Sequence, residues 1–490
     1  MASSEGRAGA GWRVSIIVLL AFALRLANIT GESLWRDEVD SIRFALQPLS
    51  ALVTTFSAVG FNGPLYHLLL RGWFALVGVS DFTLRYLSVL FGTGLVVLAY
   101  AFGYRVFSPS AGWWGAWLTA SSPVLIWYAG EGKMYSVQPA LLALGFYALV
   151  RAAQRRAWRW WGAFVFATSA SFYLHLLSPL ALIVVLAFCA ASVVLLRQQW
   201  HRVAVALAAL TVPYLPLLAW QLPSFLAGVG SALPRYAPEV ALGTLINNWS
   251  FGLDPHAPLP PSASPELGRA LRAGVLALGF LGLAYGLWRR RSRLGFAVLG
   301  WAVLPPAALV LLSLQVPLFL PRYVLWSATG FYLLLGNGIA VLRPPLRGAL
   351  VGLLSAVSVA GVVAQVVHPI RPDLRGAVEH VLHRARPGDA VVLLIPYAKH
   401  SFTYYADRLG TDAHSLRMIE APFTNRGDPP EQIYARLRAL LSNAERIWFF
   451  ETEPALWDAR GLTAAWLEQN WVKLEQQAFR GVRIALYVLR

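Results

Sequence analysis

Asp37 and Glu38 form an acidic pair shortly after the first apolar stretch of the chain, residues 12–29. Carboxylates are rare in this part of the sequence, because residues 1–367 contain only ten Asp and Glu. A carboxylate can act as the general base that takes a proton from an acceptor hydroxyl or amine. An acidic pair where a chain leaves a bilayer therefore indicates chemistry at the membrane surface.

Two cations have the chemistry to hold a phosphate leaving group. Lys133 lies between two apolar stretches and is the only Lys before residue 399, and Arg322 lies at the start of a later stretch. An apolar groove beside these cations could hold a lipid tail. Together these parts fit transfer of a sugar from a polyprenyl-phosphate carrier, and they would equally serve a phospholipid-modifying enzyme.

Other polar side chains lie at the same ends of the apolar stretches. The candidate substrate contacts are Asn62, His67, Tyr135, His175 and Tyr323. Arg85 is a third candidate phosphate contact, and Glu131 is a third candidate catalytic acid.

Each of these residue types also has a structural use. Asp37 and Glu38 suit the start of a helix. Glu131 and Lys133 could form a surface ion pair, and Arg322 could extend toward the membrane interface along its apolar stem.

The composition is that of a membrane protein. The 490 residues are 57% hydrophobic and only 13% charged, whereas soluble proteins are about 25% charged. The net charge of +17 comes mostly from Arg in short loops between apolar stretches. The positive-inside rule accounts for that pattern, so we expect no nucleic-acid partner. The single Cys189 excludes a disulfide framework and a Cys-based metal site.

Eleven apolar stretches are long enough to be membrane spans. They are residues 12–29, 82–104, 110–128, 133–151, 158–174, 177–196, 203–221, 268–288, 294–314, 323–341 and 346–367. If the basic loops between them are cytoplasmic, residues 63–79 must enter and leave on the outer face. We therefore expect 63–79 to be a helix in the outer leaflet, with the N-terminus inside and the C-terminal part outside.

The pattern predicts two domains. Residues 1–367 form a mostly α-helical polytopic membrane domain, with membrane-surface helices in the outer loop 30–81 and a long Pro-rich outer loop at 222–267. Residues 368–490 alternate between strand-like and helical patterns, which is typical of a small α/β domain. The strands are predicted at 390–395, 447–450 and 482–488, and the helices at 373–385, 429–443 and 461–470.

Four stretches, in this order, resemble the membrane glycosyltransferases of the C-type fold. The most similar branch contains the dolichyl-phosphate-mannose protein mannosyltransferases, the aminoarabinose lipid A transferase and bacterial relatives. Residues 35–38 resemble the acidic motif of the first outer loop, and residues 62–66 resemble the Pro-Pro-Leu-Tyr motif. Residues 78–88 resemble the Gly-x-Ser-x-x-x-x-Arg-x-x-Ser stretch, and residues 122–135 resemble the stretch that contains Ser-Gln-Glu-x-Arg-x-Tyr.

Three positions depart from these motifs. Gly63 replaces the first Pro, Gly130 replaces Gln and Lys133 replaces the usual Arg. Lys keeps the positive charge but loses the bidentate geometry of Arg on a phosphate. We therefore expect altered donor geometry rather than loss of activity.

The resemblance implies inverting transfer of a sugar from an undecaprenyl- or similar polyprenyl-phosphate donor. The acceptor would be a lipid, a glycan or a protein at the outer face of the bacterial cytoplasmic membrane. By this resemblance Asp37 is the catalytic base, Glu131 a substrate-positioning acid and Lys133 a phosphate contact. It implies no cofactor, and a metal is not generally required. The histidines His380 and His383 share one helix face, but no third ligand is evident nearby, so we expect no metal site there.

Two other functions stay open. A transporter or flippase of lipid-linked intermediates would need paired broken helices and polar residues near the bilayer midplane. The apolar stretches have few ionisable groups in their middles. A non-catalytic envelope assembly protein would use residues 368–490 as a docking module.

Overall fold

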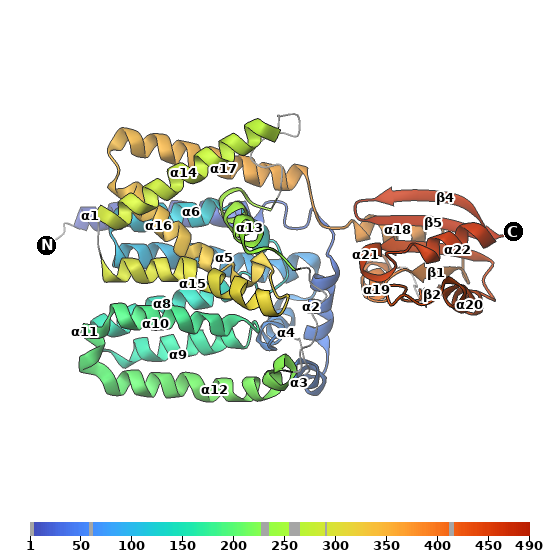
Figure 1. Ribbon diagram of the computed structural model, residues 1–490, viewed down its shortest axis with the longest axis horizontal. Coiled ribbons are helices and arrows are strands. Elements are labelled where there is room, and N and C mark those ends of the chain that lie inside the picture. The colour runs from blue at the N-terminus through green and yellow to red at the C-terminus, as the bar shows by residue number, and fades with distance from the viewer. Residues whose placement is uncertain (1–3, 58–61, 227–234, 254–264, 290–291, 411–415) are drawn as a thin grey trace. The chain divides into compact units, whose positions relative to one another are not determined.

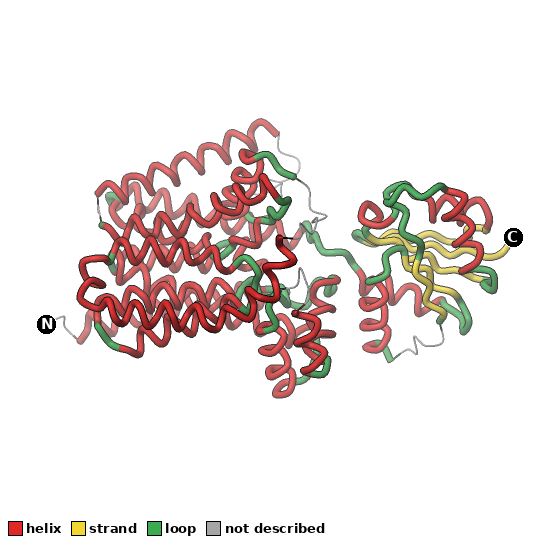
Figure 2. The backbone as a smooth tube through the Cα atoms, turned by 60° about the horizontal axis from the view of Figure 1, so that its bottom comes forward, coloured by secondary structure: helices red, strands yellow, loops and turns green. Residues whose placement is uncertain are grey.

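The computed structural model describes residues 4–57, 62–226, 235–253, 265–289, 292–410 and 416–490. Contacts divide the chain into two compact units. The helical unit contains residues 1–29 and 44–368, and the tail unit contains residues 30–43 and 369–490. Figure 1 labels the elements of both units, and Figure 2 shows that the strands lie in the tail unit.

Helices make up nearly all of the regular structure before residue 370. In chain order they are α1 (Ser4–Leu26), α2 (Arg36–Leu46), α3 (Leu49–Ser57), α4 (Leu65–Val77), α5 (Asp81–Val106), α6 (Pro109–Ser121), α7 (Pro123–Ala129), α8 (Val137–Arg155), α9 (Trp158–Phe172), α10 (Ala181–Ala191), α11 (Val193–Leu196), α12 (Trp200–Leu226), α13 (Pro238–Phe251), α14 (Pro265–Arg289), α15 (Arg293–Gln315), α16 (Ser327–Val341) and α17 (Pro344–Val367). Short 3-10 helices lie at η1 (Ser178–Leu180), η2 (Arg197–Gln199) and η3 (Pro321–Val324). Every predicted apolar stretch overlaps at least one helix, so the helical prediction is confirmed.

Three of the described helices, α5, α15 and α17, are long and apolar enough to cross a membrane by length and composition. The chain is therefore a multi-pass membrane protein, whereas the count of eleven spans and their orientation stay predictions. Helix α4 has 13 residues, fewer than the roughly 20 that a spanning helix needs. Its length fits the predicted surface helix.

The predicted stretch 110–128 is two helices rather than one, because Pro123 cannot donate a backbone N–H. In an unbroken helix that N–H would bond the carbonyl of Thr119. Buried Arg25 of α1 replaces it: its guanidinium donates to the carbonyl oxygens of Thr119 at 2.9 Å and Ala120 at 3.0 Å. Backbone groups that a proline frees inside an apolar region need a partner of this kind.

Two other predicted boundaries were wrong. Helix α8 begins at Val137 rather than at residue 133, so Lys133 lies in the turn before it. The predicted loop 222–267 contains the helix α13, which begins at Pro238 and buries Trp249. Proline suits the first turn of a helix. The many prolines of this stretch made it look like a loop, so the helix start at Pro238 was missed. Residues 227–234 and 254–264 of that loop lie outside the described residues.

The tail unit contains a mixed five-stranded sheet of order β2-β1-β3-β5-β4. Its strands are β1 (Ala390–Leu393), β2 (Arg417–Glu420), β3 (Arg446–Thr452), β4 (Trp471–Phe479) and β5 (Val482–Leu489). Its helices are α18 (Leu374–Arg384), α19 (Ala398–Arg408), α20 (Pro430–Leu440), α21 (Pro454–Trp457) and α22 (Leu462–Asn470). Strand β1 is parallel to β2 and β3, and β5 is antiparallel to β3 and β4. The α/β prediction is confirmed, although β2, β4, α19 and the short helix α21 were not predicted.

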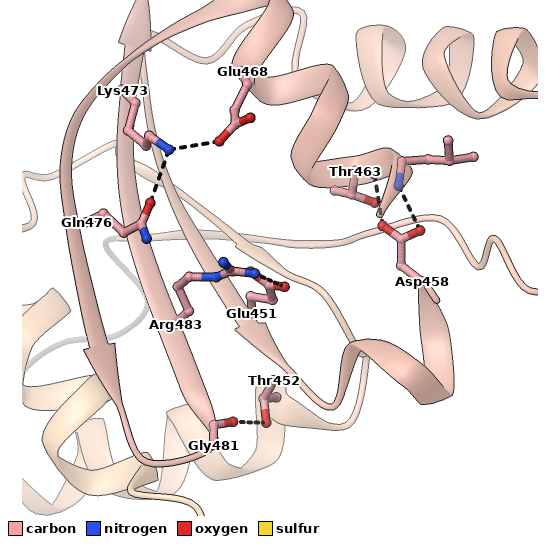
Figure 3. A network of polar contacts seen from close by, with 10 residues as sticks. Glu451, Thr452, Asp458, Thr463, Glu468, Lys473, Gln476, Gly481 and Arg483 are labelled. Atoms are coloured by element: carbon pink, nitrogen blue, oxygen red, sulfur yellow. Dashed lines mark hydrogen bonds and ion pairs between the residues drawn. The ribbon is translucent and has the colours of Figure 1, made fainter. Parts of the chain in front are cut away.

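Alternate residues of β3 pack against helices on opposite faces of the sheet. Phe449 belongs to the core cluster that includes residues of α20 and α22. Phe450 faces the other way, with its ring 5.9 Å from that of Phe402 in α19. Beside these layers, Arg483 of β5 makes two hydrogen bonds to Glu451 of β3, at 2.6 and 2.7 Å (Figure 3). The tail unit therefore has a core of its own.

Candidate active site

Four predicted site residues of the helical unit form a cluster, and one of them is a buried histidine. His175 lies in the turn after α9 and is 1% exposed. Its ring centroid lies 4.6 Å from that of Tyr323 and 6.2 Å from that of Tyr135. The guanidinium carbon of Arg322 lies 5.3 Å from the ring centroid of Tyr135. The turns after α7 and α9 and the short helix η3 thus form one cluster, although the roles of its members stay predictions.

His175 is held as a neutral hydrogen-bond donor. The backbone N–H of Leu177 donates to its Nδ1 at 3.1 Å, which places the ring proton on Nε2. Burial, and then the charge of Arg322, lowers the pKa of His175 to about 3. Among the described residues, Nε2 has no hydrogen-bond partner. An unsatisfied buried donor costs about 1–3 kcal/mol, so a ligand oxygen at this point would be stabilised.

Lys133 supplies a cation near this cluster. Its backbone is fixed, because its N–H donates to the carbonyl of Glu131 at 2.8 Å and its carbonyl accepts from the Ser88 hydroxyl at 3.2 Å. Contact of the Lys133 ammonium with a ligand phosphate and the alternative of a Glu131–Lys133 ion pair both stay predictions.

His67 lies within the electrostatic reach of Lys133. It is 5% exposed and stacks on Phe56 with ring centroids 4.6 Å apart. Burial, and to a smaller degree the charge of Lys133, holds the pKa of His67 well below its usual range. This histidine is therefore neutral. Its ring packs as an aromatic side chain and contributes no charge.

Three other candidates are tied into the structure. Glu131 is fully buried. Arg85, also fully buried, donates from Nη1 to the carbonyl of Ile29 at 2.8 Å. The Oδ1 of Asn62 accepts from the backbone N–H of Leu176 at 3.2 Å. Arg85 and Asn62 thus hold chain segments together, and their proposed contacts with substrate stay predictions.

Sequence reasoning missed the polar pair that supports the His175 turn. The side-chain amide of Gln138 in the first turn of α8 donates to the hydroxyl of Ser178 at 2.8 Å. The backbone N–H of Ser178 donates in turn to the carbonyl of His175 at 2.9 Å. A polar residue in the first turn of an otherwise apolar helix was the available signal.

Gly63, which replaces the first Pro of the motif, lies against the backbone of the His175 turn. A Cβ atom at this position would lie 2.1 Å from the carbonyl oxygen of Tyr173. That oxygen also accepts from the N–H of Leu65 at 3.1 Å. Only glycine leaves room for this approach.

Gly63→Ala is expected to lower the free energy of unfolding by about 1–3 kcal/mol, because backbone must move to admit the methyl group. The matched control is Gly72→Ala in α4, where a Cβ would meet nothing within 4 Å and where alanine favours the helix by up to about 1 kcal/mol. Thermal unfolding in one detergent compares the two variants. Equal melting temperatures for both would contradict the close approach.

The acidic pair lies in the tail unit, in the first turn of α2. Oε2 of Glu38 accepts from the backbone N–H of Trp35 at 3.4 Å, as a helix-capping carboxylate does. Asp37 is half-buried, and Asp40 forms ion pairs with Arg43 at 3.0 Å and with Arg36 at 3.9 Å. Glu38 therefore has a structural use, and the catalytic roles of Asp37 and Glu38 stay predictions.

An apolar groove of about 610 Å³ lies between α9 and α12, which run side by side (Figure 1). Its lining extends from Trp158, the first residue of α9, to Tyr173, just after the last. Tyr173 is two residues before His175. The groove thus follows the length of α9 and reaches the turn that carries the neutral histidine.

Comparisons with known proteins support the fold. Residues 62–220 match the family model described as dolichyl-phosphate-mannose-protein mannosyltransferase. ArnT from Cupriavidus metallidurans in the apo state has a TM-score of 0.61 at 12% identity, over 98% of both chains. The same protein bound to undecaprenyl phosphate has a TM-score of 0.57 at 12% identity, over 97% of this chain and 98% of that one.

The archaeal oligosaccharyltransferase AglB from Archaeoglobus fulgidus, in complex with an inhibitory peptide and a dolichol-phosphate, has a TM-score of 0.52 at 12% identity. That match covers 99% of this chain and 74% of AglB. No curated protein sequence matches the chain. At these identities the structural likeness establishes the fold alone. The predicted resemblance to membrane glycosyltransferases of the C-type fold is confirmed.

Proposed function

We propose that this protein is an inverting glycosyltransferase that uses a polyprenyl-phosphate sugar donor at the outer face of the bacterial cytoplasmic membrane. The observation that carries the proposal is the apolar groove along α9, which reaches the turn of neutral His175. An isoprenoid tail matches such a groove. The phosphate at its end matches Lys133, two residues before Tyr135, and Arg322, whose guanidinium lies over the Tyr135 ring.

The reaction follows from the chemistry of these groups. Asp37 takes the proton of an acceptor hydroxyl or amine, and the acceptor atom attacks the anomeric carbon opposite the phosphate. The bond from that carbon to the phosphate oxygen breaks, and the polyprenyl phosphate leaves with the bonding electrons. Lys133 and Arg322 stabilise the charge that develops on the phosphate. Attack from the opposite face inverts the configuration of the sugar carbon.

Two neutral or buried groups complete the site in this proposal. The Nε2–H of His175 donates to an oxygen of the phosphate or the sugar, which satisfies the buried donor. Glu131 accepts from sugar hydroxyls and orients the ring. Lipid, glycan and protein acceptors all offer the hydroxyl or amine that the reaction needs.

The comparisons support this assignment. Undecaprenyl phosphate is bound in a structure of ArnT, and dolichol-phosphate in a structure of AglB, and both proteins share the fold of this chain. The transporter and assembly-protein alternatives gain no support from these likenesses.

The test is transfer by the purified protein in proteoliposomes that contain undecaprenyl-phosphate hexoses or pentoses and a lipid extract as acceptor. We expect release of undecaprenyl phosphate and an inverted glycoside, measured by mass spectrometry and NMR. Ala209→Trp places an indole ring in the groove from α12. The lipid tail of the donor then loses part of its apolar contact with the groove, which should raise the donor KM about tenfold, roughly 1.4 kcal/mol.

Val212→Trp is the matched control, because Val212 is exposed on the same helix and does not line the groove. A donor KM that rises equally in both variants would remove the groove from donor binding. Wild-type protein that moves lipid-linked sugars across the bilayer without releasing undecaprenyl phosphate would establish the flippase alternative instead.

A further inference from the structure

The segment that leads into the acidic pair is bound by the last quarter of the chain. The hydroxyl of Ser33 donates to Oδ1 of Asp373 at 2.9 Å and accepts from the backbone N–H of Arg375 at 3.1 Å. Asp373 is the residue that caps α18, because its Oδ1 also accepts from the N–H of Gly376 at 3.1 Å. A side chain of the first outer loop thus joins a helix cap that lies 340 residues later in sequence.

Two tyrosines at α19 hold Leu34 and Arg36. The backbone N–H of Leu34 donates to the hydroxyl of Tyr405 at 2.5 Å, and both residues are buried. The guanidinium carbon of Arg36 lies 3.7 Å from the ring centroid of Tyr397, a cation–π contact. The hydroxyl of Tyr397 donates to Glu453, which fixes the orientation of that ring.

An ion pair extends the same attachment by one residue toward the N-terminus. Arg371 and Glu32 lie 3.7 Å apart, and both side chains are largely withdrawn from solvent. A pair of this kind gains more than an exposed one, because water screens it less. Residues 32–36 are therefore fixed at four points, immediately before Asp37.

We propose that the tail unit is the positioning element of the catalytic base. Tyr397, Tyr405 and the cap of α18 fix the backbone from which Asp37 projects. This inference rests on the proposed function, since it assigns Asp37 as the base. These tyrosines are positioning residues rather than catalytic ones. A misplacement of about 1 Å costs up to roughly 100-fold in rate, so loosening this attachment should lower the rate of transfer without changing donor affinity.

The double variant Tyr397→Leu/Tyr405→Phe tests the proposal in the full-length protein. It removes the ring beneath Arg36 and the hydroxyl that binds Leu34. The matched control is Tyr434→Leu/Tyr487→Phe, which also loses one ring and one hydroxyl of the tail unit but leaves Tyr397 and Tyr405 intact. Tyr434 packs against the core cluster on the opposite face of the sheet from α19.

We expect kcat for sugar transfer to fall at least tenfold in the test variant, with the donor KM and the affinity for undecaprenyl phosphate within twofold of wild type. The control should keep kcat within twofold of wild type. The melting temperatures of the test and control variants should agree. A melting temperature that falls in the test variant alone would mean that its lower kcat comes from a less stable fold, which overturns the proposal. A kcat within twofold of wild type in the test variant would overturn the proposal.

A cross-link provides a second measurement. Ser33→Cys/Arg375→Cys, in a Cys189→Ala background, should form a disulfide on oxidation, detected by mass spectrometry. We expect the oxidised protein to keep the kcat of the reduced protein, because the segment works while attached to the tail unit. Loss of activity on oxidation, restored by reduction, would show that the segment must leave the tail unit, which also overturns the proposal.

These outcomes distinguish failure of the proposed function from failure of the positioning inference. If the proposed function is wrong, wild-type protein releases no undecaprenyl phosphate from any donor. If only the positioning inference is wrong, wild-type protein is active and the test variant matches it.

Discussion

Asp37→Asn is expected to lower kcat for sugar transfer by about 1,000-fold, within the range that general-base groups contribute. The amide keeps the size of the side chain and its place in the first turn of α2, but it cannot accept the acceptor proton. Donor affinity should stay within twofold of wild type, because the proposed phosphate contacts lie on other residues. Transfer in proteoliposomes and equilibrium binding of undecaprenyl phosphate measure the two quantities separately.

Asp40→Asn is the matched control on the same helix. Asp40 forms ion pairs with Arg36 and Arg43, both of which are exposed to solvent, and pairs near the surface contribute about 1 kcal/mol or less. Its kcat should stay within twofold of wild type. Glu38→Gln keeps an oxygen that can accept from Trp35 and should also stay active. Turnover by Asp37→Asn at the wild-type rate would remove Asp37 from the mechanism, and loss of turnover in Glu38→Gln alone would move the role to Glu38.

Lys133→Met is expected to lower kcat/KM for the lipid-linked donor by about 10- to 100-fold. The variant keeps the length of the side chain and removes its charge. Hydrogen bonds to charged groups contribute about 1.5–3 kcal/mol, and each 1.36 kcal/mol corresponds to a factor of ten in rate. The loss should appear both in the affinity for undecaprenyl phosphate and in kcat, since the charge on the phosphate grows as the bond breaks.

Lys133→Arg should keep most of the wild-type kcat/KM, because it retains the positive charge and the resemblance to known transferases places Arg at this position. Lys399→Met is the control for removing a positive charge, since Lys399 is an exposed lysine of the tail unit. Should Lys133→Met and Lys399→Met retain equal kcat/KM, the phosphate would have to be held elsewhere, with Arg322 as the next candidate.

The helices were predictable from sequence because a membrane protein repeats one strong signal. Each apolar stretch must hydrogen-bond its own backbone, so it must be helical. The internal detail was less predictable. The break at Pro123 could not be predicted locally. It depends on Arg25, almost a hundred residues earlier, which donates hydrogen bonds to the freed carbonyl oxygens. Helix α13 was missed because prolines at its start were taken as loop residues.

The candidate site was partly predictable for a related reason. Polar residues at the ends of apolar stretches were selected one by one, and the structure brings His175, Tyr135, Arg322 and Tyr323 into one cluster. Their protonation states could not be read from sequence, since burial and neighbouring charge decide them. The strand β4 was missed because its residues are mostly exposed and lack a simple alternation of apolar and polar side chains.

The attachment of residues 32–36 to the tail unit had no signal in the sequence. It depends on single contacts such as that of Leu34 with Tyr405, each between residues more than 330 positions apart. Local propensity and periodicity describe neighbours along the chain and give no information about such pairs.

The separation between Ser33 and Asp373 also sets an order of events during synthesis. Residues 30–43 leave the ribosome early, whereas their partner surface is completed only when the last quarter of the polypeptide has been translated. Through all the intervening membrane insertion, the acidic segment has no surface to bind. A nascent or prematurely terminated chain therefore carries the acid without the support that orients it, and we expect the proposed transfer activity to appear only after the tail unit has been translated.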